Sequence, residues 1–283
     1  MQRTLLEGPL SRSIEPLGSP NDEDQKLTVT VALMASVFGL VFGSFLNVVA
    51  FRVPLGRSVV HPPSACPSCA APVRPRDNIP IISWLVLRGK CRDCGEPISV
   101  RYLAVEAMTG LLFAATVWIV GVVWVLPAYL WFGAVTLVLS LTDLDHKRIP
   151  NRILYPGTIV GFGLLALGGV LDGMTDDLLR GVVGALSYFV ALFLLALIAR
   201  GGFGFGDVKL SFLLGLYLAF QGWKHFGVGV FMAFFVGGLV SIILLVTRRR
   251  GRKDSIPFGP SLVAGSWIGI AFGASIADWY LGF

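Results

Sequence analysis

Two aspartates lie at the borders of long apolar runs, where an ionisable side chain is costly. Asp143 follows the uncharged run 107–142, and Asp207 shortly precedes the apolar run 210–223. A carboxylate near the centre of a membrane-spanning helix costs about 2.5 to 3.5 kcal/mol, so acids in such places are usually functional. Two carboxyl groups that share one proton can activate water against a peptide bond without a metal. The pair is therefore a candidate for acid–base hydrolysis.

The segment around Asp143 reads TDLDHKRIPN, in which Pro150 prevents a regular helix from continuing. At the C-terminal end of the preceding helix, the negative end of the helix dipole disfavours the ionised form of Asp143. Asp145 is the reserve candidate for Asp143. It lies two residues further along the same helix end, so its side chain points in another direction but lies at nearly the same depth in the membrane. The alternative is that both acids are solvated loop carboxylates paired with Lys147 and Arg148.

The segment before Asp207 reads GGFGFG and holds four glycines in six residues. Such a backbone can bend, and an extended substrate can approach it closely. Asp207 then lies at the N-terminus of the next helix, which stabilises an anion. We expect Gly204, Gly206 and Lys209 to contact substrate. The alternative is a glycine-rich hinge with a helix-capping aspartate. One helix end disfavours the ionised carboxylate and the other stabilises it, so we expect one aspartate to serve as general acid and the other as general base.

All four cysteines fall in one loop, as CPSC and CRDC with twenty-one residues between the pairs. Cys66, Cys69, Cys91 and Cys94 can form a tetrahedral structural Zn²⁺ site, which is closed and has no position for a reacting water. Disulfides, redox chemistry and unligated thiols are the alternatives. We interpret the apolar segment NIPIISWLVLRGK between the pairs as an interfacial hairpin that packs on the membrane domain.

The composition, 55% hydrophobic and 14% charged with a mean hydropathy of +0.76, excludes an ordinary soluble domain. Uncharged runs predict an all-α polytopic membrane protein with about eight transmembrane helices. Pro127 breaks the longest run into two helices joined by a tight turn. The runs are 27–51, 107–142, 153–171, 181–199, 210–223, 226–247 and 255–277.

Most of the Lys and Arg residues fall on one side if the first helix runs from outside to inside. Basic loops stay cytoplasmic, so the cysteine loop and both aspartates are expected to face the cytoplasm. We therefore interpret the net charge of +6 as a consequence of membrane topology and of contact with anionic lipid headgroups. No nucleic-acid partner is expected. We divide the chain into a disordered polar tail (1–26), a first transmembrane helix (27–51), a cytoplasmic loop domain (52–101) and a membrane domain (102–283).

Six ordered segments together resemble a prepilin peptidase, the type IV leader peptidase of bacteria. They are GSFLNVVAFRVP, the CPSC and CRDC pair, ISVRYLAVE, DLDHKRIPN, GFGDVKL and IPFGP. The resemblance covers about residue 35 to the C-terminus. The GxGD element by itself also occurs in other intramembrane aspartyl proteases. Thr142 and the long polar tail depart from the commonest pattern of the family.

The resemblance implies an aspartyl endopeptidase of the bacterial inner membrane that removes the leader of type IV prepilins or pseudopilins on the cytoplasmic side. It places the catalytic pair on Asp143 and Asp207. Family members with the cysteine region commonly also methylate the new N-terminus with S-adenosylmethionine. Asn47, Glu106 and Arg101 are plausible polar groups for binding, although each could equally satisfy backbone groups at a helix border. The oligomeric state stays open.

Two other classes of protein remain as alternatives. A proton- or cation-coupled secondary transporter would use the two aspartates as relays, but the sequence has no internal repeat to support it. A membrane adaptor would present the zinc loop to a cytoplasmic partner without chemistry of its own. Serine and metalloprotease schemes are disfavoured, because no serine has an evident histidine partner and no HExxH segment is present.

Overall fold

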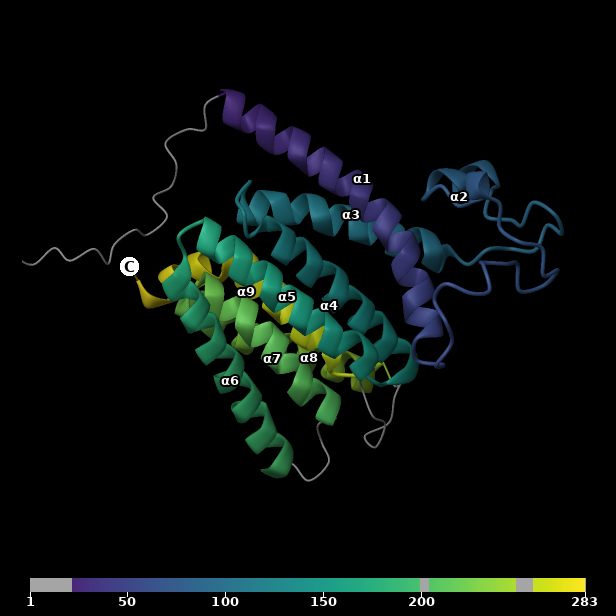
Figure 1. Ribbon diagram of the computed structural model, residues 1–283. Coiled ribbons are helices and arrows are strands. Elements are labelled where there is room, and N and C mark those ends of the chain that lie inside the picture. The colour runs from purple at the N-terminus through teal and green to yellow at the C-terminus, as the bar shows by residue number, and fades with distance from the viewer. Residues whose placement is uncertain (1–21, 199–203, 248–256, 283) are drawn as a thin grey trace, which may run out of the picture.

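The fold is a bundle of long helices with a small loop domain at one end (Figure 1), as seen in a computed structural model that describes residues 22–198, 204–247 and 257–282. The long helices are α1 (Asp22–Arg52), α3 (Val100–Val120), α4 (Leu126–His146), α5 (Asn151–Leu171), α6 (Thr175–Ile198), α7 (Phe205–Gln221), α8 (Trp223–Val246) and α9 (Gly259–Leu281). The loop domain adds the 3₁₀ turn η1 (Pro75–Asp77) and the short helix α2 (Ile82–Val86). The predicted all-α membrane architecture is confirmed.

Seven of the long helices are long and apolar enough to cross a membrane, and α7 is the shorter eighth. Most α7 residues are buried, including nearly all from Val208 to Phe220. At 1.5 Å per residue its 17 residues span only about 26 Å. Protein therefore surrounds α7 on most sides, and this explains how a short, lysine-containing helix fits within the bundle.

The predicted break in the longest apolar run is confirmed. Helix α3 ends at Val120, and Gly121 follows with φ +84°, a conformation that favours glycine. Helix α4 begins at Leu126 with Pro127 in its first turn. The Asp172 carboxylate accepts hydrogen bonds from the backbone N–H groups of Trp124 and Val125, at 3.1 and 3.0 Å. This carboxylate satisfies donors that the first turn of α4 leaves free.

Helix α1 begins at Asp22, five residues before the predicted start of the first span. Asp22, Glu23 and Asp24 occupy its first turn, where acidic side chains interact favourably with the helix dipole. Lys26 pairs with Asp22 at 3.6 Å one turn away. The polar end of the segment is thus helical from residue 22, and residues 1–21 of the predicted tail lie outside the described residues.

Small residues bring neighbouring helices close together, as is common in membranes. A Cβ atom on Gly184 of α6 would lie 2.1 Å from the Cβ of Ala219 on α7. Likewise, a Cβ on Gly265 of α9 would lie 2.1 Å from the backbone nitrogen of Ala233 on α8. Larger residues at these positions would separate the helices that carry the site.

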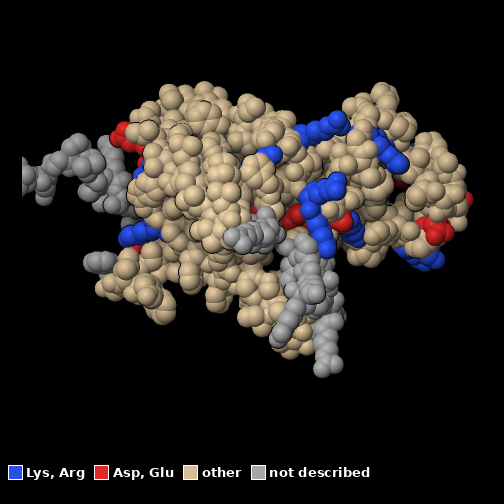
Figure 2. All heavy atoms as spheres, turned by 90° about the horizontal axis from the view of Figure 1, so that it is seen from below, with Lys and Arg blue, Asp and Glu red and all other residues tan. Residues whose placement is uncertain are grey.

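Charged side chains gather at the two ends of the bundle. Figure 2 shows a broad uncharged flank between a small charged end and the opposite end, which adjoins the loop domain. At the small end, Lys224 pairs with Asp278, and Arg180 pairs with Asp177. The arrangement matches a chain whose middle lies in hydrocarbon.

Candidate active site and metal centre

Helices α4 and α7 run antiparallel and are joined at one end by two tyrosines. The Tyr129 hydroxyl donates to the backbone carbonyl of Tyr217 at 3.2 Å, and the Tyr217 hydroxyl donates to that of Ala128 at 3.1 Å. Asp143 follows Tyr129 by roughly 21 Å of helix, and Asp207 precedes Tyr217 by roughly 15 Å. Both aspartates therefore lie at the opposite end of the helix pair, on the same side of the bundle.

Both aspartates are buried and close enough to influence each other. Asp143 is 5% exposed and Asp207 is 8% exposed. The negative charge of Asp143 acts on Asp207 across the site. The segments around them also touch, because a Cβ on Gly206 would lie only 3.1 Å from the Cβ of Ile149 in the α4–α5 connection. The structure thus brings together two acids that are distant in the sequence.

Each carboxylate accepts a hydrogen bond from the backbone at the start of a helix. Asp207, the third residue of α7, bonds the backbone N–H of the N-cap residue Gly204. This is the helix-capping arrangement that the sequence left open. Asp143 accepts at 3.0 Å from the backbone N–H of Gly259, the first residue of α9. Asp143 lies in the last turn of α4 and Asp207 in the first turn of α7, as expected, but α9 adds a second helix N-terminus at Asp143. Which of the two acids carries the proton stays a prediction.

Gly259 is the site residue that sequence reasoning missed. A Cβ at this position would lie 2.7 Å from Oδ2 of Asp143, so a larger residue would displace the carboxylate. The signal available in the sequence was the Pro-Phe-Gly-Pro segment near the start of the last apolar run. Such a segment predicts a helix start but does not identify what that start contacts. Ile256, the first residue of the IPFGP element, lies outside the described residues, as do Gly201 and Gly202.

Asp145 has a different environment from Asp143. It is exposed, and its two carboxylate oxygens accept from Nη1 and Nη2 of Arg101 at 2.9 and 2.5 Å. Arg101 belongs to the first turn of α3, directly after the cysteine loop. Asp145 therefore joins the end of α4 to the start of α3, and its carboxylate is engaged by that ion pair. Neither acid forms an ion pair with Lys147 or Arg148 in the described part of the chain.

The predicted substrate contacts near Asp207 have local partners. Lys209 donates to Oδ1 of Asn151 at 3.2 Å, and its ammonium lies 4.8 Å from the ring centre of Phe205. The backbone face of Gly206 is covered by Ile149, whereas Gly204 is exposed. Gly204 thus remains the open position of this group.

Asn47 and Glu106 lie between α1, α3 and the cysteine loop. The Asn47 side-chain amide donates to the carbonyls of Gly43 and Tyr102 at 3.3 and 3.4 Å. Glu106 is buried and accepts from the backbone N–H of Ile81 at 2.8 Å, before α2. Both side chains hold backbone groups in place. These bonds are the backbone-satisfying role that the sequence left open for both residues, and a role in binding stays a prediction.

The four cysteines form a compact cluster. Their Sγ atoms all lie within 4.8 Å of one another, and those of Cys66 and Cys94 are 3.7 Å apart. Four sulfurs at 2.3 Å from one Zn²⁺ ion would be separated by about 3.8 Å. The four cysteines are free in the described structure, without a disulfide. The donor set and spacing fit a tetrahedral metal.

The two cysteine pairs adopt the same local structure. The backbone N–H of Cys66 donates to Ala71 and that of Cys91 to Glu96, at 2.9 and 2.8 Å. Each pair is followed by a residue with positive φ, Ala70 in the first and Gly95 in the second. Hydrogen bonds from the backbone N–H groups of Cys69 and Ser68 lower the pKa of the Cys66 thiol to about 7. A thiolate is the form that a metal binds.

Ion pairs surround the cluster. Arg92 binds Asp77 through Nε and Nη2 at 2.6 to 3.0 Å, and this hydrogen bonding lowers the pKa of Asp77 below its ordinary value. Arg74 pairs with Asp93 at 2.9 Å. The predicted hairpin is instead the short helix α2, whose Ile82, Leu85 and Val86 side chains are exposed.

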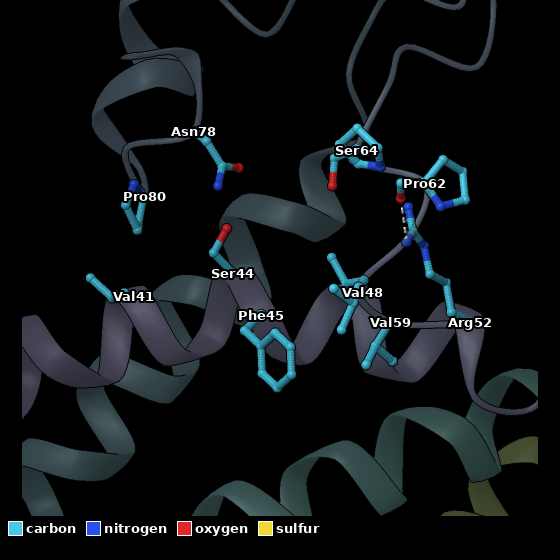
Figure 3. Close-up of a pocket in the computed structure, with 12 residues that line it drawn as sticks. Val41, Ser44, Phe45, Val48, Arg52, Val59, Pro62, Ser64, Asn78 and Pro80 are labelled. Carbon is cyan, nitrogen blue, oxygen red and sulfur yellow. Dashed lines mark hydrogen bonds between the residues drawn. The ribbon is translucent and has the colours of Figure 1, made fainter. Parts of the chain in front are cut away.

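A pocket outside this cluster lies between α1 and the loop domain (Figure 3). It has a volume of about 340 Å³. Residues 41–52 of α1 form one wall, and the loop segments 59–64 and 78–80 form the other. In Figure 3, Arg52 reaches the backbone carbonyl of Pro62 at one end of the pocket.

Comparison with known proteins identifies two families along the chain. A profile described as the bacterial peptidase A24 N-terminal domain matches residues 37–120, and one described as the type IV leader peptidase family matches residues 130–246. The first profile covers the cysteine loop, and the second covers both Asp143 and Asp207. No solved structure matches the fold significantly.

Curated relatives are similar over most of their length. A protein of Bacillus subtilis named prepilin leader peptidase/N-methyltransferase is 34% identical over 245 residues, covering 87% of this chain and 96% of that protein. A protein of Pseudomonas aeruginosa with the same name is 35% identical over 276 residues, covering 89% and 93%. These matches, together with the profile over both aspartates, show that the chain belongs to the type IV leader peptidase family.

Proposed function

We propose that this protein is a membrane aspartyl endopeptidase that removes the leader peptide of type IV prepilins or pseudopilins. The observation that carries the proposal is the convergence of two buried carboxyl groups at one end of the antiparallel helices α4 and α7. The names of the full-length relatives supply the substrate class. The comparisons give no support to the transporter alternative.

The two carboxyl groups would hold one water molecule between them. One carboxylate removes a proton from the water as its oxygen attacks the scissile carbonyl carbon. The other carboxyl group protonates the departing nitrogen, and the peptide bond breaks. The Gly259 N–H binds Oδ2 of Asp143 and so fixes the rotation of the side chain, and no residue in the described ranges donates to Oδ1, which we assign to the water.

We assign the catalytic pair to Asp143 and Asp207, and we leave Asp145 out of it. Asp145 lies near Asp143 in the sequence, but Arg101 occupies both of its oxygens. A carboxylate whose two oxygens both accept from one arginine is held by that contact and is not positioned to bind the reacting water. Gly204 is the position at which we expect the substrate backbone to approach, since it is exposed beside Asp207.

We also propose that the site faces the cytoplasm of a bacterial inner membrane. The end of the bundle that carries the aspartates also carries the basic cysteine loop, whereas acidic residues outnumber basic ones among the described residues at the other end. Basic loops remain on the cytoplasmic side. Residues 248–253, which hold five Lys or Arg residues in the sequence, lie outside the described residues and do not enter this argument.

The cysteine cluster would hold a structural Zn²⁺ ion. Cys66, Cys69, Cys91 and Cys94 would fill all four positions of a tetrahedral ion, so the metal stabilises the loop without taking part in hydrolysis. We extend the N-methyltransferase activity named for the relatives to this chain, with S-adenosylmethionine as donor class. The binding residues for that donor are left unassigned.

Cleavage of a synthetic prepilin segment by the purified full chain tests the function. The segment carries a basic leader, a glycine before the cut and a hydrophobic helix, and mass spectrometry identifies the products. We expect one cut after the glycine with the unmodified chain and none with Asp207→Asn. A transporter or adaptor would leave the segment intact in both cases.

A further inference from the structure

The pocket between α1 and the loop domain lies on the outer side of the bundle. Val41, Phe45, Val48 and Arg52 recur every three or four residues, so they share one face of α1. The buried residues Gly43, Leu46, Asn47 and Ala50 form the opposite face, which packs against the rest of the bundle. The pocket therefore opens on the side of α1 that faces lipid.

The depth of the pocket corresponds to a membrane interface. Gly43 of α1 lies beside Glu106 of α3, and Glu106 binds the loop backbone at Ile81. The loop domain thus meets α1 near residue 44, in the half of the predicted span 27–51 that lies toward the loop, and its polar groups place the boundary of the hydrocarbon on this face of α1 between residue 44 and Arg52. Asn78 and Pro80 of the loop lie near Val41 and Ser44 in Figure 3, and Ser64 lies near Val48.

The chemistry of the pocket is amphipathic and basic. Val41, Phe45 and Val48 offer an apolar surface, whereas Ser44, Asn78 and Ser64 offer polar groups. Arg52 is the one charged lining residue. Two backbone carbonyls, those of Ser58 and Pro62, accept from its Nη1 at 3.1 and 2.7 Å. These bonds fix the guanidinium but leave Nε and Nη2 without a partner among the described residues.

We propose that this pocket binds one anionic phospholipid. The acyl chain lies along Val41, Phe45 and Val48, and the phosphate accepts hydrogen bonds from Arg52. Arg57, exposed in the same loop, adds positive charge near the headgroup. Basic side chains beside an apolar surface at the membrane boundary favour anionic lipids in this way.

Two other occupants fit less well. The methyl donor carries a positive sulfonium group, but the pocket lining has no Asp or Glu to balance it. A basic leader peptide would be repelled by Arg52 and Arg57, because all of these side chains are positively charged. Both would also bind on the face of α1 that points away from α3, whereas the aspartates lie within the bundle.

Native mass spectrometry of the purified full chain, titrated with phosphatidylglycerol or phosphatidylcholine, tests the proposal. We expect one tightly retained phosphatidylglycerol and weaker retention of phosphatidylcholine. Val48→Trp fills the pocket and should abolish the tight binding. Val37→Trp is the matched control, because Val37 is 62% exposed on α1 but lies outside the pocket. Arg52→Gln should weaken binding about fivefold, and Arg88→Gln, outside the pocket, should leave it unchanged.

Equal retention of phosphatidylglycerol by the Val48→Trp and Val37→Trp variants overturns the proposal. So does equal affinity for the two lipids, or a loss of S-adenosylmethionine binding in Val48→Trp without loss of lipid. Circular dichroism of each variant establishes that the helices are intact. Because lipid retention is measured without substrate, failure of the proposed peptidase activity would not affect the result.

Discussion

The cysteine cluster and the aspartate pair differ in how far apart their members lie along the chain. The four cysteines occupy residues 66–94, and each pair folds its own turn through local backbone hydrogen bonds. The aspartate site takes Asp143 from α4, Asp207 from α7 and Gly259 from α9. One site is a local structure that a metal can complete, and the other exists only when the bundle is assembled.

This difference predicts opposite responses to damage. Disruption of the cysteine cluster should unfold the loop domain and leave the bundle intact. Disruption at the aspartates should stop catalysis while the loop domain still binds metal.

The largest expected effect is the loss of cleavage in Asp143→Asn and Asp207→Asn. General acid and base groups each contribute about 10² to 10⁴ in rate, so either variant should be at or below detection. Metal content should be unchanged. Asp176→Asn, at the other end of the bundle, is the control, and Asp145→Asn should retain most activity. Inactivity of Asp145→Asn with full activity of Asp143→Asn would reverse our assignment.

The second effect concerns the metal. Loss of a residue that hydrogen-bonds to a metal ligand costs roughly 10- to 100-fold in metal affinity. Cys91→Ser removes a ligand itself, so it should weaken Zn²⁺ affinity by more than that. Elemental analysis should give about one zinc per unmodified chain and little in the variant. Limited proteolysis should then cut within 66–97, while the melting of the bundle is unchanged. A folded, reduced chain without metal would contradict the zinc assignment.

The third effect tests the contact of Asp143 with α9. Gly259→Ala would place a Cβ 2.7 Å from Oδ2 of Asp143, and a misplaced catalytic group can cost on the order of 10²-fold in rate. We expect kcat to fall with KM nearly unchanged. Gly163→Ala is the matched control, since a Cβ there meets no atom within 4 Å. Equal activities of the two variants would show that the contact has no role.

The smallest effect links the two regions. Arg101→Gln removes the ion pair with Asp145, and an exposed pair contributes about 0.2 to 1 kcal/mol, so cleavage should fall at most about fivefold. The exchanged pair, Arg101→Asp with Asp145→Arg, should recover part of the loss. A double-mutant cycle with no coupling energy would mean that the loop domain and the aspartate site are independent at this contact.

The pH response of the loop domain follows from Asp77. Its lowered pKa means that the ion pair with Arg92 is present above the ordinary Asp value and is lost only as the pH falls through the lowered value. Arg92→Gln should therefore destabilise the loop equally from pH 6 to pH 8, as measured by hydrogen exchange. A pH-dependent effect in this range would exclude this pair as its cause.

Several features could be predicted because they depend on neighbours in the sequence. The apolar runs predicted the helices, Pro127 predicted the break before α4, and the spacing of the cysteines predicted their cluster. Helix α7 was expected to be short, and it is. The start of α1 was placed too late, because charged residues were read as a tail although acids also favour the first turn of a helix.

The sequence by itself determined an all-helical membrane chain, a loop with four thiols at metal-binding distance, and two acids next to helix ends. Their chemistry follows from residue type and from short-range geometry. Only the tertiary structure decided that Asp143 meets Asp207, that Gly259 binds Asp143, and that Arg101 occupies Asp145. Those contacts depend on how helices far apart in the chain pack, and close packing between small residues sets that arrangement without a local signal.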